Sequence, residues 1–210
     1  RAEAESALRA EVAAVGSRLS TLEELKRAYE GVDEAVKSAL AERREKGAVG
    51  LVADVLDVPA EWLDAASAAL GPALSAVVFT HTDALDEAAE ALVGKDKGRV
   101  AFLALDRAQA IAETYVRASG QRFNEASSWG GSTALASVVR ARGGADALVP
   151  ALLAGVFALD DEKEARRASE LYPEFTWVSR RGTVFAKGLV TAGRAQDADR
   201  GLLRREHEIQ

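Results

Sequence analysis

The sequence predicts an α/β domain made of two related halves, with a helical arm at each end. In the central part, short apolar runs alternate with helix-like segments, which is typical of βαβ units in a largely parallel sheet. Residues 72–79 and 150–157 match at six of eight positions, and each copy is followed by an acidic helix start, a helix and another strand. Charged helical patterns precede and follow this central part.

The first segment, residues 1–45, is predicted to be a coiled-coil arm. Charged residues fill most of the surface of its predicted helix, and the apolar seam follows a spacing of 4, 3, 4 and 3 through Leu8, Val12, Val15, Leu19 and Leu22. That spacing is typical of two-stranded coiled coils. The alternative is an amphipathic helix packed on a globular core, which usually has a wider apolar stripe.

The first half of the domain, residues 46–126, is expected to begin where Gly47 and Gly50 break the helical pattern. Proline and glycine residues then separate the predicted elements from one another. In order, these are a strand-like entry near residue 50, a helix over 60–70, a strand over 76–79, a helix over 83–93 with Thr82 as its N-cap, and a strand over 100–105.

The second half, residues 127–194, is expected to repeat this order. Residues 107–142 are predicted to be helical, apart from a glycine- and serine-rich loop at 127–133 that separates the halves. Asp160 and Asp161 are expected to lie at a helix N-terminus, where negative charge is favourable. The remaining predicted elements are a helix ending near 171, a strand over 175–179, a hairpin turn at 180–182, a strand over 183–186, and a returning arm over 195–210.

Composition argues against catalysis. Cysteine is absent, which excludes disulfides and thiolate metal sites. His81 and His207 lack the local spacing of a metal site, and the sequence has neither a phosphate-binding loop nor a dinucleotide-binding fingerprint. We therefore expect no catalytic site, no metal and no cofactor. Methionine is also absent, so we expect a piece of a longer protein, and no apolar run reaches the ~18 residues of a membrane span.

The charge balance predicts at most weak contact with nucleic acid. Twenty-seven basic and 33 acidic residues give a net charge of −6, the opposite sign to that of most dedicated DNA-binding proteins. The hypothesis is that small basic groups converge and touch phosphates without reading bases. The alternative is ordinary solvated surface charge. The candidate contacts are Arg43, Arg44 and Lys46; Lys95, Lys97 and Arg99; and Arg180, Arg181 and Lys187.

A β-prone run near the C-terminus, residues 189–191, is enclosed by Gly188 and Gly193. It could be an ordinary hairpin strand with turn glycines. It could also be an open edge strand, where glycine lets another backbone approach and main-chain hydrogen bonds join two chains.

Several motifs occur in a fixed order along nearly the whole chain. They are residues 29–32 and 47–54, residues 58–62 and 69–71, residues 98–106, the glycine motif of Gly182, Gly188, Thr191 and Gly193, and residues 202–209. As an ordered set they resemble one known family, the hinge domain of bacterial SMC (structural maintenance of chromosomes) proteins. The chain departs from the family pattern at Ala192, where a second glycine is usual, and at Ala104, where a proline is usual.

This resemblance implies two subdomains and a ring-like homodimer joined through edge strands. The dimer interface it implies consists of Gly182, Gly188, Leu189, Val190, Thr191 and Gly193. It also implies a cytoplasmic, nucleoid-associated parent protein that condenses and segregates chromosomes and hydrolyses ATP in head domains outside this chain. Accessory subunits are not expected to bind this fragment, nor is a membrane. The alternatives are a small-molecule-binding α/β domain or enzyme, and a spacer without DNA affinity.

Overall fold

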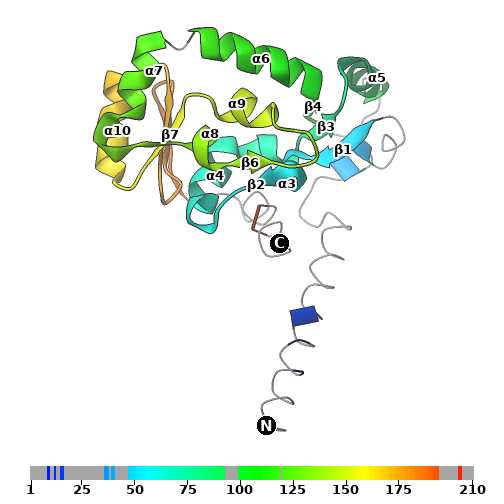
Figure 1. The fold of residues 1–210 in the computed structure, drawn as a ribbon, viewed down its shortest axis with the longest axis horizontal. Coiled ribbons are helices and arrows are strands. Elements are labelled where there is room, and N and C mark those ends of the chain that lie inside the picture. Colours follow the sequence, from blue (N-terminus) through cyan, green and yellow to red (C-terminus); the bar gives the residue numbers. More distant parts are fainter. Residues whose placement is uncertain are drawn as a thin grey trace.

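The computed structural model describes residues 47–92, 99–118 and 120–193, together with isolated arm positions at 9, 12, 15, 16, 36, 37, 39, 40, 203 and 204. Of residues 115–118 it describes the backbone alone. Helices pack around two main sheets, which confirms the predicted α/β class (Figure 1). One sheet has the order β1-β3-β4, the second has the order β10-β9-β8-β7-β5, and β2 and β6 form a separate two-stranded ladder.

The first βαβ unit confirms the predicted order of strand, helix and parallel strand. β3 (Val77–Phe79) leads through α5 (Thr82–Leu92) to β4 (Phe102–Ala104), and the two strands pair in parallel. β1 (Ala48–Leu51) pairs antiparallel with the other side of β3. Between β1 and β3 lie α3 (Val52–Val55), β2 (Leu56–Asp57), the 3₁₀ helix η2 (Ala60–Trp62), α4 (Leu63–Leu70) and the 3₁₀ helix η3 (Gly71–Ser75).

The predicted N-cap role of Thr82 is wrong. Thr82 is the first residue of α5, and its hydroxyl donates to Asp106 Oδ1 at 2.7 Å. The Thr82 backbone N–H donates to Asp106 Oδ2 at 2.9 Å. A carboxylate that follows β4 therefore satisfies the start of α5, which sequence spacing alone did not indicate.

The second βαβ unit repeats the first. β7 (Val156–Leu159) leads through α10 (Glu162–Leu171) to the parallel strand β8 (Thr176–Ser179). Asp161 caps α10 as expected, because its side chain accepts a hydrogen bond from Lys163 N at 2.8 Å. The repeated sequence segments end at Phe79 and Phe157, and both rings are fully buried in their strands. On the outer side of β8, β9 (Val184–Ala186) and β10 (Leu189–Thr191) continue the sheet antiparallel.

The region between the two units differs in part from the predicted helix over 107–142. α6 (Leu105–Ala118) and α7 (Gly120–Ser127) are helical, and α6 lies against α9 (Leu148–Leu153) along one side of the molecule (Figure 1). The expectation of continuous helix after residue 133 is wrong. Only the short α8 (Leu135–Val138) is helical there, between β5 (Thr133–Ala134) and β6 (Arg140–Ala141), and this segment follows the 3₁₀ helix η4 (Trp129–Gly131). Consecutive β-branched residues and pairing of β6 with β2 override the helical pattern there.

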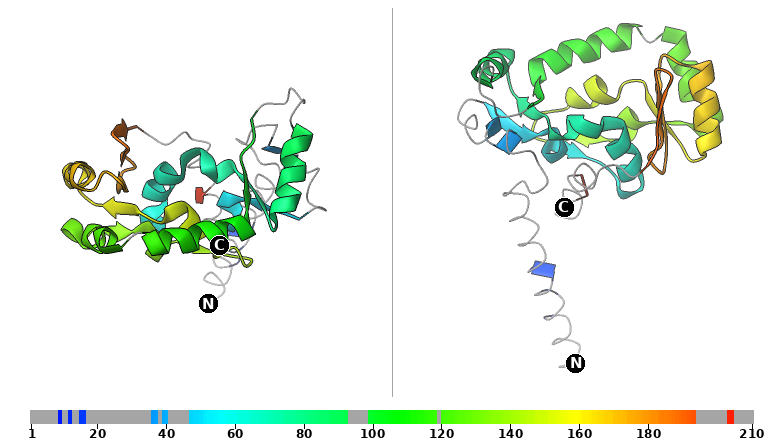
Figure 2. Two further views of the ribbon diagram at one scale, coloured as in Figure 1. Left: turned by 90° about the horizontal axis from the view of Figure 1, so that it is seen from above. Right: turned by 180° about the vertical axis from the view of Figure 1, so that it is seen from behind.

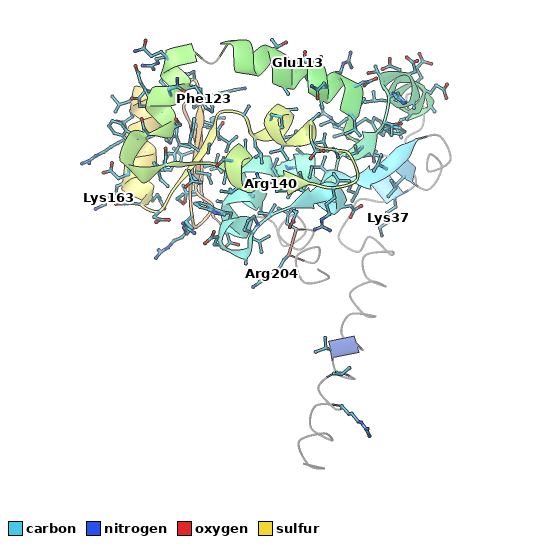
Figure 3. The ribbon with its side chains drawn as sticks, in the orientation of Figure 1. Lys37, Glu113, Phe123, Arg140, Lys163 and Arg204 are labelled. Atoms are coloured by element: carbon cyan, nitrogen blue, oxygen red, sulfur yellow. The ribbon has the colours of Figure 1, made fainter. Side chains whose placement is uncertain are left out.

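Two clusters of buried side chains hold the fold together. The larger cluster includes Leu51, Leu74, Leu148 and Leu153, and so draws on both sides of the predicted boundary between residues 126 and 127. That boundary stays a prediction. The smaller cluster is aromatic. The ring of Phe123 on α7 (Figure 3) lies 5.3 Å from the ring of Phe157, which stacks on Trp177.

Three described arm residues belong to the larger core. Val36, Leu40 and Leu203 are all nearly inaccessible to solvent. Farther out, Val12 and Val15 of the predicted seam are helical and largely exposed in the single chain. The rest of the predicted arms, residues 1–45 and 195–210, lies outside the described residues, so the coiled-coil pairing stays a prediction.

Candidate dimerisation edge

The β9–β10 hairpin is closed by a two-residue turn at Lys187 and Gly188. Leu189 stands opposite Ala186, and the two turn residues have φ values of +51° and +77°. Positive φ at both central residues matches the twist of β-hairpins, and glycine accommodates it at little cost. The sequence signalled only half of this turn. Its second position is glycine, but its first is Lys187, which is the only non-glycine residue with positive φ among the described residues.

β10 is one of the two terminal strands of the five-stranded sheet, and β5 is the other. Leu189 and Val190 are 71% and 51% exposed, and β10 itself carries no charged side chain. Residues next to a two-residue turn form a hydrogen-bonded pair, and such pairs alternate with non-hydrogen-bonded ones. Val190, opposite Phe185, therefore directs its N–H and C=O away from β9. An exposed, apolar edge of this kind is a template for pairing with another chain.

The glycines of the predicted interface have two different environments. A Cβ added at Gly188 or Gly193 would meet nothing within 4 Å. Gly182, in contrast, is buried, and a Cβ there would lie 3.3 Å from both Ala68 Cβ and Asp64 O on α4. Gly182 therefore permits close packing of the β8–β9 turn within its own chain, and this placement does not support a role for it at the edge.

A second open edge was not foreseen from the sequence. β4 ends the three-stranded sheet on the side opposite to β1. Viewed from above, β4 and the β9–β10 hairpin lie toward opposite ends of the molecule (Figure 2). The signal that could have found this edge is the order of the first βαβ unit, because β4 is its last strand.

The basic residues do not converge into one patch among the described residues. Arg99 lies just before β4, whereas Arg181 and Lys187 lie in the two turns of the β8–β9–β10 region, and all three are exposed. Five of the nine candidates lie outside the described residues: Arg43, Arg44, Lys46, Lys95 and Lys97.

Arg180 is held by contacts within the chain. Its guanidinium pairs with Asp160, donates from Nη1 to Glu61 O at 3.3 Å, and lies 4.1 Å from the centre of the Trp62 ring. These contacts join the end of β7, the η2 turn and the β8–β9 turn. We therefore assign Arg180 a structural position and remove it from the set of residues available to phosphates.

Two exposed carboxylates have perturbed acidity. Hydrogen bonds from Thr82, the one from its backbone N–H having the largest effect, lower the pKa of Asp106 below its ordinary value of 3.8. The hydrogen bond from Arg122 lowers the pKa of Glu174, and Arg122 lies 4.8 Å from the centre of the Tyr172 ring. Both carboxylates have structural partners, and no cluster of three or more metal-ligating side chains occurs among the described residues.

We expect Asp106→Asn to destabilise the domain more at pH 7 than at pH 3. The folded-state pKa of Asp106 lies below its unfolded-state value, so its contribution is present above the unfolded-state value and is lost as the pH falls through the folded-state value. Urea unfolding of the wild type and the variant at both pH values measures this. An equal difference in the free energy of unfolding between wild type and variant at both pH values would contradict the assigned hydrogen bonds.

The fold and the open edges define a small α/β module suited to pairing with another chain. A family model described as the SMC proteins flexible hinge domain matches residues 45–169. The chain belongs to the SMC hinge domain family. This confirms the family expected from the sequence motifs and the prediction that the fragment is not an enzyme.

Similar proteins agree with this family. The chain is 34% identical over 215 residues to the chromosome partition protein Smc of Myxococcus xanthus. The alignment covers 97% of this chain and 17% of that relative. The chain thus spans about a sixth of the length of the curated relative it matches. An asymmetric dimer of the Geobacillus stearothermophilus SMC hinge domain matches with a TM-score of 0.81 and 26% identity, covering 99% of this chain and 84% of that one.

A more distant hinge shares the fold. The Pyrococcus furiosus SMC hinge domain matches with a TM-score of 0.58 and 17% identity, covering 86% of this chain and 90% of that one. Within the described part of the chain, the helices are too short or too polar to span a bilayer.

Proposed function

We propose that this hinge domain forms a homodimer in which β10 of one copy pairs with an open sheet edge of the second copy. The observation that carries the proposal is the exposed edge of β10, where apolar side chains accompany outward-directed backbone groups at Val190. Main-chain hydrogen bonds would supply register, and burial of Leu189 and Val190 would supply affinity. The related Geobacillus hinge was solved as a dimer.

The second open edge gives β10 a partner strand. β4 and β10 are both three residues long, and each ends a sheet of the same chain. If β10 of each copy pairs with β4 of the other, a twofold axis relates two identical contacts and the pair closes as a ring. Gly188, Leu189, Val190, Thr191 and Gly193 form the donor edge in this proposal; Gly182 does not.

Sedimentation equilibrium of the 210-residue chain tests this proposal. The expected mass is twice the 22.2 kDa of one chain at micromolar concentration. A single-chain mass that persists at the highest concentration would contradict it.

In the parent protein, we propose that the dimer links two arms and supports chromosome condensation and segregation at the nucleoid in the cytoplasm. The proposal rests on family membership and on the Myxococcus relative, a chromosome partition protein. ATP hydrolysis would belong to head domains of the parent protein.

DNA contact by this fragment is proposed to be weak and independent of sequence. Arg99, Arg181 and Lys187 are exposed, but the chain as a whole is acidic. We expect gel-shift binding at low salt to disappear by about 200 mM salt, because each phosphate contact releases counterions. Arg181→Ala, which removes a cation that does not line the proposed dimer edge, should weaken binding several-fold, whereas Lys163→Ala on α10 should not. Undetectable binding by the wild type at low salt would remove the proposal.

A further inference from the structure

A groove of about 310 Å³ opens beside the proposed donor edge, between α10 and the β9–β10 hairpin. Its floor includes the nearly buried rings of Phe175 and Phe185, and one wall includes Leu189 and Val190 of β10 itself. Because β10 forms a wall, any strand that pairs with β10 brings its own flanking elements to the mouth of the groove.

The groove carries more positive than negative charge. Arg166 and Lys187 line it, against a single carboxylate from Glu170. The Arg166 guanidinium lies 5.3 Å from the centre of the Phe185 ring, which keeps this cation at the groove. An acidic surface is therefore the complement that the groove fits best.

The same chain presents such a surface on α5. This helix exposes the carboxylates of Asp83, Asp86, Glu87 and Glu90, while Ala88 on its other side is buried against the domain. α5 packs mainly on β4, the proposed acceptor strand, just as α10 packs mainly on β8. Joining β4 to β10 thus brings α5 of one copy near α10 of the other.

The handedness of the two βαβ units decides whether α10 and the partner's α5 lie on the same face of the joined sheet. In each unit the second strand is nearer the edge that would pair: β4 in the first unit and β8 in the second. Crossovers between parallel strands share one right-handed sense. An antiparallel joint between β10 and the partner's β4 relates the two units by a rotation in the plane of the sheet, which leaves both helices on one face. A parallel joint would place them on opposite faces. Antiparallel pairs are the commoner and slightly more stable kind.

The expected distance between α10 and the partner's α5 also fits a contact through side chains. Three strand-to-strand steps separate β8 from the partner's β4, roughly 14 Å at about 4.8 Å per step. Helices in direct contact lie about 8–10 Å apart. The two helices would thus be separated by one layer of side chains, which is where the groove lies.

We infer that, in the hinge dimer, the groove between α10 and the β9–β10 hairpin receives the acidic helix α5 of the second copy. This inference rests on the proposed β10–β4 pairing and adds to it the strand direction and a charged contact. Each dimer would contain the contact twice. Partner recognition would then depend on Arg166 and Lys187 of one copy meeting α5 carboxylates of the other.

A charge-reversal experiment on the 210-residue chain tests the inference. Arg166→Glu should raise the dimer dissociation constant about tenfold at low salt, and the effect should shrink at high salt. Lys163→Glu is the matched control. It makes the same charge change on α10 (Figure 3), but Lys163 does not line the groove, so its effect should stay within about twofold. Near-ultraviolet circular dichroism checks that both variants keep the native fold.

The reciprocal change completes the test. Asp86→Arg with Glu90→Arg should weaken the dimer alone and restore it to within about threefold of wild type when combined with Arg166→Glu. Equal effects of Arg166→Glu and Lys163→Glu, or a lack of rescue, would overturn the inference while leaving the β10 edge standing. Failure of the edge itself would show separately, as a dimer that survives Gly188→Glu unchanged.

Discussion

Gly188→Glu is expected to convert the hinge dimer into monomers. Gly188 precedes the outermost strand, has a φ of +77° and faces open space in the single chain. A glutamate there would place an unpaired charge where the second backbone approaches, and burying an unpaired charge costs about 3–5 kcal/mol. Since each ~1.4 kcal/mol is tenfold in affinity, the dissociation constant should rise at least a hundredfold by sedimentation equilibrium.

The matched control for this substitution is Gly143→Glu. Gly143 also has a positive φ, and a Cβ added there would meet open space as at Gly188, but it lies in the turn after β6. Backbone strain and added charge are therefore similar in both variants, and only the position relative to β10 differs. A full dimer in Gly188→Glu, or equal dissociation in both variants, would contradict the assigned interface. Gly193→Glu is expected to behave like Gly188→Glu.

Leu203→Ala is expected to lower the free energy of unfolding by about 2–5 kcal/mol. Leu203 belongs to the returning arm segment, yet it is only 2% exposed and lies in the larger core. Truncating it would leave a cavity among side chains of the domain. Such an effect would show that the arm is anchored inside the hinge core.

Urea unfolding at one fixed protein concentration measures this change, because dimerisation makes stability depend on concentration. Leu171→Ala serves as the control, since Leu171 at the end of α10 is half exposed and should cost under about 1 kcal/mol. If both variants lose a similarly small free energy of unfolding, Leu203 contributes little to the core.

Local signals predicted the two βαβ units well. The repeated segments at 72–79 and 150–157 lead into β3 and β7 as expected, and Asp161 caps α10. These features depend on neighbouring residues: an apolar run makes a buried strand, and a carboxylate next to free N–H groups makes a cap. The sequence also marked residues 189–191 as a β-prone run between glycines, and β10 occupies that range.

Contacts between distant residues were harder to foresee. Thr82 binds Asp106, 24 residues away, and Arg180 reaches Glu61, 119 residues away. Single-sequence patterns contain no information on such pairs. For the same reason, the pairing of β6 with β2 replaced a predicted helix, and the open edge of β4 became visible only once the strand order was known.

Amide exchange at Val190 tests the central claim most directly. In the single chain, its N–H points away from β9 and has no partner strand at this edge among the described residues. We predict that the Val190 amide exchanges slowly at concentrations where the chain is dimeric and rapidly in Gly188→Glu monomers. Fast exchange of Val190 within a confirmed dimer would show that the two copies join elsewhere.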